Sequence, residues 1–477
     1  MVLTANGLKA DVSFLASDEL EGRGTPSKGL DVAAEYIAAQ YRRAGLEPVG
    51  DNDYFQTAAF GQVTPNAEGV AFTLEAGGQT LRADKATLSI QDGAALDLSQ
   101  AGAFKVLSTD TEAINALTPA QVKGKVVLYL MPEAAAAPPA GAGRGGRGGG
   151  RGGVNPRVAL AVAKAEAALL VVVRPAAQPQ TTSQTPRLKD MSTGGVPQMS
   201  VTDAAIYAAV VAAKPGPLDG TVSAHLAAPT VVPVKLRNVV GLLRGSDPVL
   251  KDTYVVLTGH YDHLGIRGTG PGDHIFSGAN DDASGTSSVI EIAGALGSLP
   301  TRPKRSILFI ALFGEELGDL GSHYYAAHPI FPLAKTIADV NLEQLGRTDE
   351  TGEGEKIGQF NLTGFDYTNM PAIFSKYGEM TGIKVVKDAA KSDPYFSRSD
   401  NAAFADVGVP STTLSVTYSF SDYHGAGDEW PKLNYENMAK VDRTIALAAY
   451  SMADSTEEPQ WNASNPRTEA YRKVRGK

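Results

Sequence analysis

From residue 232 onwards, short apolar runs alternate with stretches in which apolar residues recur every three or four positions. The runs predict strands and the helical spacing predicts helices, and their alternation is typical of a mostly parallel sheet covered by helices. The predicted strands are Val234–Leu243, Tyr254–Thr258, Ile307–Leu312, Ile337–Leu342 and Thr412–Val416. The predicted helices are Ser284–Leu296, Leu320–Ala327, Pro371–Thr381 and Tyr435–Met452. We therefore expect an α/β domain over residues 232–477.

The first 65 residues have a helical pattern of their own. Leu8, Val12 and Leu15 recur at helical spacing, and a second apolar stripe runs from Leu30 to Ala44. Turn-forming residues separate the two stripes, so an ordered loop is expected between them. We expect residues 1–65 to form a helical segment that packs on the α/β domain.

Residues 66–231 carry shorter β-type runs and predict a smaller, inserted, β-rich α/β domain. Val126–Leu130 is such a run, and a helical stretch over Arg157–Ala167 leads into another at Leu169–Val173. Residues 134–153 are almost entirely Ala, Pro, Gly and Arg, a composition that cannot bury enough apolar surface to order itself, so this tract is expected to be disordered. The alternative is an RNA-binding arm using Arg144, Arg147 and Arg151. The absence of interleaved aromatic residues disfavours that alternative.

Composition narrows the classes of function. A chain of 477 residues with 43% hydrophobic content can build more than one core. A net charge of -9 argues against nucleic acid or an anionic membrane as the main partner. No apolar stretch reaches the roughly 20 residues that a membrane helix needs, and the first residues lack a signal peptide pattern. The absence of cysteine excludes thiolate chemistry and leaves imidazole and carboxylate as the metal ligands.

Residues of that kind follow the apolar runs in an ordered series, where an open α/β sheet places its ligand crevice. The series is His260, Asp281, the adjacent pair Glu315 and Glu316, Glu343 and His424. Two imidazoles and three carboxylates suffice for two divalent cations about 3.5 to 4 Å apart, because one carboxylate can bridge them. The series therefore predicts a two-metal hydrolase site.

Two further carboxylates have open roles at such a site. Adjacent side chains point in different directions, so one of Glu315 and Glu316 can bind metal while the other transfers protons. Asp262 lies two residues after His260 and could accept the second ring N–H of that histidine, which would fix its tautomer. Each motif alone has a structural explanation, as a polar loop, a solvated acidic pair or a packed histidine.

The complete series resembles family twenty-eight of the metallopeptidases, the co-catalytic di-zinc exopeptidases that include bacterial leucine aminopeptidases and glutamate carboxypeptidase II. The resemblance rests on His260-Tyr261-Asp262, Asp281-Asp282-Ala283-Ser284-Gly285, Glu315-Glu316, Asn341-Leu342-Glu343 and Tyr423-His424. It also covers the N-terminal segment, where Asp18–Gly24 and Ala44–Pro48 resemble members with a protease-associated insert, and Val122–Val127 resembles the insert itself.

The resemblance implies roles for single residues. Asp281 would bridge two zinc ions, His260 and Glu343 would complete one site, and Glu316 and His424 would complete the other. Glu315 would be the general acid and base, with Asp262 orienting His260. A cis peptide would join Asp281 and Asp282. Tyr423 would either hydrogen-bond the tetrahedral intermediate or simply pack. Glu343 stands where many members have aspartate, and another divalent metal could replace zinc.

The same resemblance implies an aminopeptidase that releases N-terminal residues from peptides by metal-activated water. A carboxypeptidase or dipeptidase is the alternative within the family, since Arg347 or Arg398 could bind a substrate carboxylate. Asp400 or Asp422 could instead hold a free α-amino group. A glutaminyl cyclase-like transferase and a catalytically silent receptor-like scaffold are alternatives from other classes. The family also implies peptide substrates, no nucleic-acid or membrane partner, a monomer or homodimer, and a periplasmic or secreted location.

Overall fold

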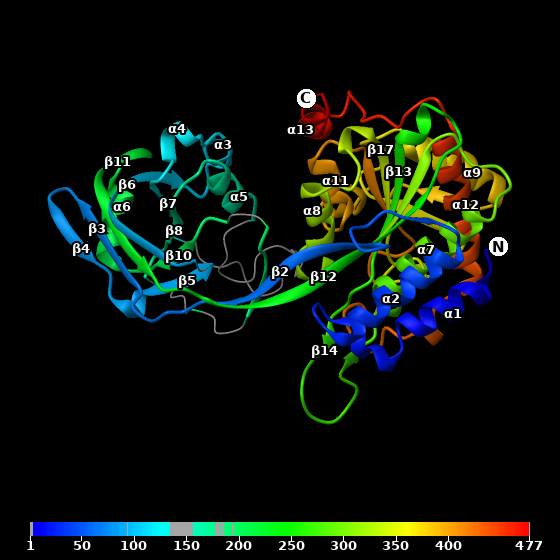
Figure 1. The fold of residues 1–477 in the computed structure, drawn as a ribbon, viewed down its shortest axis with the longest axis horizontal. Helices are drawn as coiled ribbons and strands as arrows, with labels where there is room; N and C mark the ends of the chain where they lie inside the picture. Colours follow the sequence, from blue (N-terminus) through cyan, green and yellow to red (C-terminus); the bar gives the residue numbers. More distant parts are fainter. Residues whose placement is uncertain are drawn as a thin grey trace. The chain divides into compact units, whose positions relative to one another are not determined.

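A computed structural model of the protein describes residues 3–92, 94–133, 156–176, 182, 186–192 and 195–476. The chain divides into two compact units, the first made of Met1–Ala58 and Leu236–Lys477 and the second of Ala59–Lys235 (Figure 1). The boundaries expected from sequence were residues 65/66 and 231/232. The tract 134–153, with the arginines considered for RNA binding, lies outside the described residues.

The first unit is built on a mostly parallel sheet with the strand order β21-β20-β22-β17-β13-β16-β12. β13 is parallel to β16 and β17, β17 is parallel to β22, and β20 is parallel to β21. β12 runs antiparallel to β16, and β20 runs antiparallel to β22. These strands confirm the five predicted for this region. Their bounds are β12 Thr230–Leu243, β13 Tyr254–His260, β16 Ser306–Leu312, β17 Thr336–Leu342, β20 Gln359–Leu362, β21 Lys384–Val386 and β22 Ser411–Ser415.

Helices cover both faces of this sheet, as the alternation in the sequence predicts (Figure 1). Successive strand residues point to opposite faces. Leu308 therefore packs in one apolar cluster with Tyr325 and Phe404, while Phe309 contacts Tyr41 on the other side. The helices on the Tyr41 side are α1 Ala5–Leu15, α2 Lys28–Arg43, α7 Ser284–Gly297, α9 Met370–Thr381 and α12 Tyr435–Asp454, and those on the other are α8 Leu320–Ala327 and α11 Asn401–Asp406.

The N-terminal segment is helical only in its first part, so the prediction of a helical segment over residues 1–65 is wrong towards its end. β2 occupies Phe55–Thr64, and its buried and exposed side chains roughly alternate, which suits a strand better than a helix. The loop expected between the first two helices contains η1, a 3-10 turn over Asp18–Arg23. Glu21 and Gly22 have positive φ angles that prevent this turn from continuing as a helix.

The second unit is β-rich, as predicted. Its eight-stranded sheet has the order β4-β3-β11-β6-β7-β8-β10-β5, with β6, β7, β8 and β10 parallel. α6, Ala204–Ala212, packs on one face through Ile206, and α5, Pro156–Lys164, packs on the other through Val162. Its strands are β3 Ala71–Ala76, β4 Gln79–Arg82, β5 Leu88–Asp92, β6 Leu96–Leu107, β7 Val126–Leu130, β8 Leu169–Val173, β10 Gln198–Val201 and β11 Gly216–Leu226. Its likeness to a protease-associated insert stays a prediction.

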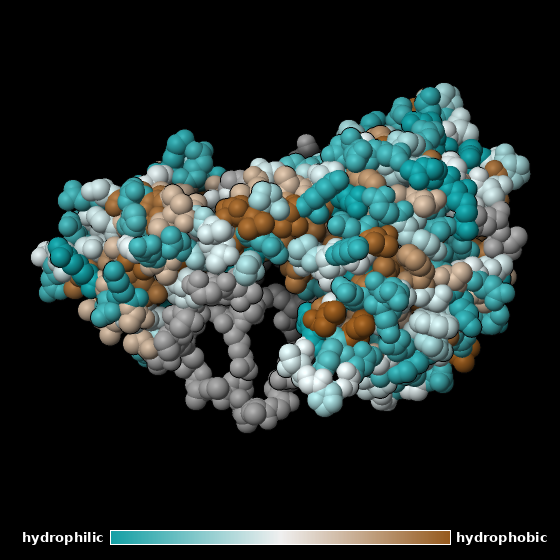
Figure 2. Space-filling model, turned by 60° about the horizontal axis from the view of Figure 1, so that its bottom comes forward, coloured by the Kyte–Doolittle hydropathy of each residue, from teal (hydrophilic) through white to brown (hydrophobic). Residues whose placement is uncertain are grey.

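The described surface carries hydrophobic side chains in small groups among hydrophilic ones on the face drawn in Figure 2. The most exposed large apolar residues, such as Val249, Ile357 and Met380, lie far apart in the sequence. None of the helices in the described part of the chain combines the length and apolarity needed to cross a membrane.

Candidate metal centre

The centre lies at the carboxyl ends of the parallel strands, and its first member ends β13. His260 is fully buried, and its backbone carbonyl accepts a hydrogen bond of 2.7 Å from the Thr286 hydroxyl. Its Nε2 lies 3.3 Å from Oδ1 of Asp281. β13 therefore places the imidazole beside the carboxylate that is expected to bridge two ions.

Asp281 lies in the turn that opens α7, and the chain reaches it through Gly278, which has a φ of 59°. The peptide between Asp281 and Asp282 is cis, as the sequence resemblance implied. The carboxylate of Asp428 accepts hydrogen bonds of 3.0 Å from the backbone N–H groups of Asn280 and Asp281. Asp428 thus fixes the backbone of the turn, and the Asp281 side chain faces the strand ends.

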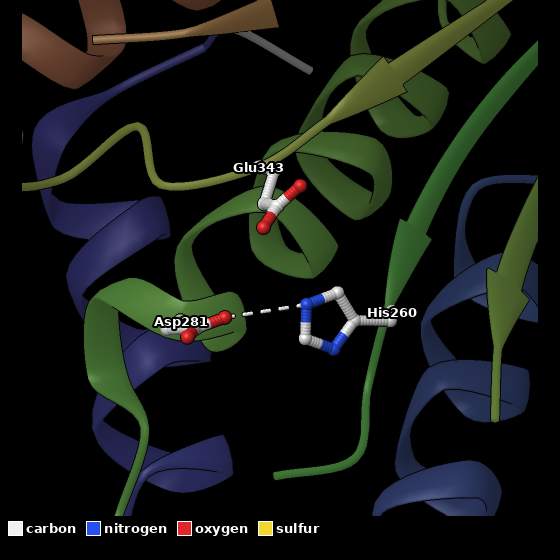
Figure 3. A group of neighbouring side chains, drawn as sticks. All are labelled: His260, Asp281 and Glu343. Atoms are coloured by element: carbon white, nitrogen blue, oxygen red, sulfur yellow. Dashed lines mark ion pairs between the residues drawn. The ribbon is translucent and has the colours of Figure 1, made fainter. Parts of the chain in front are cut away.

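Glu343 follows β17 directly and completes the first group. One ligand atom from each of His260, Asp281 and Glu343 lies within 4.8 Å of the others. Figure 3 shows these three side chains pointing towards a common centre, with the His260–Asp281 contact as a dashed line. The extra methylene of glutamate at position 343 does not keep its carboxylate from this group.

Glu315 and Glu316 lie in η5, the short 3-10 turn after β16, and Gly314 enters that turn with a φ of 71°. Oε2 of Glu315 is 3.9 Å from Nε2 of His260. Oε1 of Glu316 is instead 3.3 Å from Nε2 of His424. The adjacent glutamates therefore lie beside different histidines of the centre.

His424 comes from the loop after β22 and is the least buried member, with a side chain 29% exposed. Its Nε2 lies 3.1 Å from Oδ2 of Asp281, whereas Nε2 of His260 lies 3.3 Å from Oδ1 of the same carboxylate. The Tyr423 ring stacks on the His424 imidazole with 4.1 Å between ring centroids. All five predicted ligands thus converge, with Asp281 between the two halves.

Prediction from sequence missed one histidine of the centre, His263. It is buried, and its Nδ1 lies 2.9 Å from Oε1 of Glu316. With Asp281 and Glu316 it forms a second group whose ligand atoms lie within 4.8 Å of one another. The feature that could have found it is its place three residues after His260, in the same turn that follows a buried strand.

Asp262 lies between the two histidines and joins parts of the centre through its carboxylate. Oδ1 is 3.6 Å from Nδ1 of His260, while the backbone oxygen of Asp262 is 3.2 Å from the same nitrogen. Oδ1 also accepts a hydrogen bond of 3.1 Å from the backbone N–H of Glu315, and Oδ2 accepts one of 3.0 Å from the Thr25 hydroxyl.

The electrostatics of the centre favour positive charge. Burial lowers the pKa of His260, but the carboxylates of Glu315, Asp262 and Asp281 raise it well above its usual value. Burial also lowers the pKa of His424, and Asp281 and Glu316 outweigh it to give a pKa of about 9. Burial raises the pKa of Asp281, yet His260 and His424 hold that pKa well below its usual range. A divalent cation that bound here would replace protons on the imidazoles.

These residues also fit a metal by the state of their buried atoms. Among the described residues, Nε2 of His260 and both carboxylate oxygens of Asp281 are buried without a hydrogen bond. A buried polar atom without a partner costs free energy, and several carboxylates together cost more unless a cation neutralises them. Imidazole nitrogen and carboxylate oxygen are ligands that zinc accepts.

An open cleft of about 390 Å³ adjoins the centre. His263 and Glu316 form part of its wall, with Glu21, Thr25 and Arg267 among the other lining residues. The turn of the N-terminal segment therefore shapes the approach to the centre, a contribution that the sequence pattern did not reveal.

Two of the residues that were considered for substrate binding have other partners, and a third is buried. The Arg347 guanidinium donates to both carboxylate oxygens of Asp349 at 2.6 Å and to Asp422 at 2.8 Å. Asp422 also accepts from Lys432 at 3.0 Å. Asp400 is fully buried, and burial followed by the charge of Asp319 raises its pKa to about 8. The structure therefore argues against Arg347 as a carboxylate receptor and against Asp400 and Asp422 as amine receptors.

Comparison with known proteins agrees with this geometry. The chain is 33% identical over 233 residues to aminopeptidase YwaD of Bacillus subtilis, covering 47% of this chain and 46% of that protein. It is 27% identical over 255 residues to probable leucine aminopeptidase 2 of Aspergillus oryzae, covering 48% and 47%. This chain thus spans about half the length of these two relatives.

A solved structure of a zinc aminopeptidase from Bacillus subtilis has the same fold, with a TM-score of 0.50 at 18% identity over 95% of this chain and 96% of that chain. Residues 238–449 match peptidase family M28, and this segment contains every proposed metal ligand. The resemblance found in the motifs is thereby confirmed for residues 238–449, the part of the chain that matches the M28 family.

Proposed function

We propose that the protein is a two-zinc aminopeptidase that removes N-terminal residues from peptides. The observation that carries this proposal is the position of Asp281, whose two carboxylate oxygens face different histidines at 3.3 and 3.1 Å. A carboxylate placed in this way can bridge two cations. The names of the relatives and the family match support the same class of reaction.

In this proposal, His260 and Glu343 hold one ion with Asp281, and Glu316 and His424 hold the other. Two zinc ions would polarise the scissile carbonyl and acidify a water molecule. Asp262 keeps His260 in place through the backbone and carboxylate contacts described above. Zinc is the metal that the relatives' names favour, while the number of ions rests on the shared position of Asp281.

Glu315 is the proposed general base and acid. Its side chain is buried beside His260, and its backbone is tied to Asp262. Glu315 would accept a proton as the water oxygen bonds to the carbonyl carbon, and would return that proton to the amine as the carbon–nitrogen bond breaks. Tyr423 stays a proposed partner for the tetrahedral intermediate, and its stacking on His424 also suits a positioning role.

An aminopeptidase is favoured over a carboxypeptidase because Arg347 is saturated by Asp349 and Asp422. Arg398 remains the candidate for a carboxylate receptor, since its Nε is buried without a hydrogen bond among the described residues. A periplasmic or secreted location is proposed from the family resemblance alone.

The test is a panel of aminoacyl p-nitroanilides, N-blocked peptides and peptides amidated at the C-terminus, assayed with and without a chelator, together with metal analysis. We expect about two zinc ions per chain and cleavage that needs a free α-amino group but not a free carboxylate. Equal cleavage of N-blocked peptides would rule out the aminopeptidase. One bound ion would favour a cyclase-like transferase, and none would favour a silent scaffold.

A further inference from the structure

His263 is the one buried histidine of the centre to which the proposed function gives no role. It follows Asp262 in the turn after β13, and its backbone N–H donates to the carbonyl oxygen of Arg23 at 3.2 Å. Arg23 in turn donates to the carbonyl oxygens of Tyr261 at 2.8 Å and Gly278 at 3.0 Å. The turn that carries His263 is therefore fixed by the N-terminal segment.

The His263 ring has little freedom. A Cβ atom added at Gly278 would lie 2.4 Å from Cγ of His263, so the ring packs directly against the backbone of the turn that carries Asp281. Both ring nitrogens of His263 are buried, and neither makes a hydrogen bond to the described residues. A buried imidazole held in this way, without a hydrogen bond at Nδ1 or Nε2, calls for an explanation.

The surroundings of Nδ1 supply an explanation for that nitrogen. Nδ1 of His263 lies 2.9 Å from Oε1 of Glu316, and Nε2 of His424 lies 3.3 Å from the same oxygen. The two imidazoles meet edge to face with 5.7 Å between ring centroids. An imidazole that only supported Glu316 would contact the carboxylate oxygen turned away from the ion. His263 instead converges with His424 on Oε1 of Glu316, and Nε2 of the same His424 lies 3.1 Å from Oδ2 of Asp281.

We propose that His263 is a fourth protein ligand of the second ion, beside Asp281, Glu316 and His424. This inference rests on the proposed function. The two halves of the centre would then differ, because four protein ligands close one site while His260, Glu343 and Asp281 leave a position open at the other. Closed sites hold zinc as structural sites do, and open sites keep room for water or substrate. The closed site would bind metal more tightly, and the open site would exchange it.

The test is cobalt(II) titration of chelator-treated protein, followed by calorimetry and visible absorption. Wild-type protein should show two binding events, the tighter at the closed site. His263→Ala should weaken the tighter event by more than the roughly 10- to 100-fold that loss of a supporting residue causes, and should change the absorption of the first bound ion. His274→Ala is the matched control, because His274 is only partly buried and its ring nitrogens contact backbone oxygens of its own loop.

His263→Cys gives an independent readout. The protein has no other cysteine, so a thiolate-to-cobalt charge-transfer band could come only from position 263. Circular dichroism of each variant checks folding, and the thiolate band identifies a ligand even if His263→Ala is unstable.

Three results decide the matter. Wild-type metal affinity and wild-type absorption in His263→Ala would overturn the inference. A loss of affinity within the 10- to 100-fold range, with unchanged absorption and no thiolate band, would also overturn it, because that result marks a supporting residue. A wild-type protein that binds one ion would overturn the two-ion function instead. The thiolate band would in that case still show whether position 263 contacts the metal.

Discussion

Oδ1 of Asp262 accepts a hydrogen bond from the backbone N–H of Glu315 at 3.1 Å. The same carboxylate lies beside Nδ1 of His260, so one side chain connects the proposed base to a proposed metal ligand. Because Asp262 is fully buried, small changes in its position reach both partners.

Asp262→Asn should lower metal affinity at the His260 site by about 10- to 100-fold, since the amide keeps the shape but loses the charge that favours the His260 tautomer. The measurement is zinc competition with a chromophoric chelator, alongside kcat. Thr25→Val, which removes only the hydrogen bond to Oδ2, should have a much smaller effect. An unchanged affinity and kcat in Asp262→Asn would leave Asp262 without the proposed role.

Glu315→Gln should reduce kcat by about 10²- to 10⁴-fold, because an amide cannot carry the proton from water to the amine. Metal content should stay at the wild-type level, since Glu315 is not a proposed ligand. Glu436→Gln, at an exposed position in the first turn of α12, is the control. Full turnover in Glu315→Gln would assign the base elsewhere.

Gly278→Ala should weaken both metal binding and stability. The added methyl would meet the His263 ring and the Asp281 carbonyl oxygen at 2.4 Å, and φ at this position is +59°. Gly382→Ala isolates the backbone effect, because φ there is +75° and nothing lies within 4 Å of the new methyl. The control should lose about 1 kcal/mol of unfolding free energy and no metal affinity. Equal losses in the two variants would show that the His263 ring is not tightly packed there.

Arg23→Met should destabilise the fold by about 3 kcal/mol or more, since it leaves several buried carbonyl oxygens without a donor. The guanidinium donates to the carbonyl oxygens of Leu15, Tyr261, Ser277 and Gly278. Burial lowers the pKa of Arg23 to about 10, so it stays charged at neutral pH. Arg42→Met, which removes an exposed pair with Asp53 and a cation–π contact with Tyr54, should cost less than about 1 kcal/mol. Comparable melting temperatures for the two variants would contradict this role of Arg23.

Stability should also depend on the ionisation of Asp11, which lies between α1, α2 and α7. Burial is the main cause that raises the pKa of Asp11 from 3.8 to about 7, and the charge of Glu291 adds to the rise. The hydrogen bond from Tyr36 and the charge of Arg43 oppose it. Between these two values the folded state binds more protons than the unfolded state, so the contribution is full below pH 3.8 and is lost as pH rises through 7.

Relative to wild type, Asp11→Asn should therefore gain stability between pH 5 and pH 8, by on the order of 1 to 3 kcal/mol. Denaturant unfolding at the two pH values measures the difference. A variant that gains nothing on going from pH 5 to pH 8 would show that Asp11 titrates normally in the folded protein.

The sequence was sufficient for the parts of this molecule that repeat a pattern. Apolar runs located β13, β16, β17 and β22, and residues at their ends proved to be neighbours because parallel strands bring their carboxyl ends to one edge. The sequence did not reveal His263 as a member of the centre, because the alternation of a strand would place it on the face opposite Asp262. Only the turn after β13 brings it back to the centre. The sequence did not reveal the contacts of Arg23, because a single arginine in a glycine-rich turn has no periodicity that predicts its position.

Some of the alternatives for substrate binding found no support in the structure for a different reason. Arg347, Asp400 and Asp422 all lie near the ligands along the chain, as the prediction assumed. The sequence could not show the ion pairs of Arg347 and Asp422 or the burial of Asp400, since ion pairs and burial depend on how loops fold in three dimensions. Short polar loops carry no pattern that fixes those contacts in advance.

The hydrogen bond from Arg23 to Ser277 spans 254 positions of sequence. Contacts between such distant residues form late in folding, because a long loop must close before they stabilise anything. The reactive cluster would thus mature only after its N-terminal scaffold docks, and a chain trimmed of that scaffold would retain every proposed metal-binding side chain yet assemble them poorly.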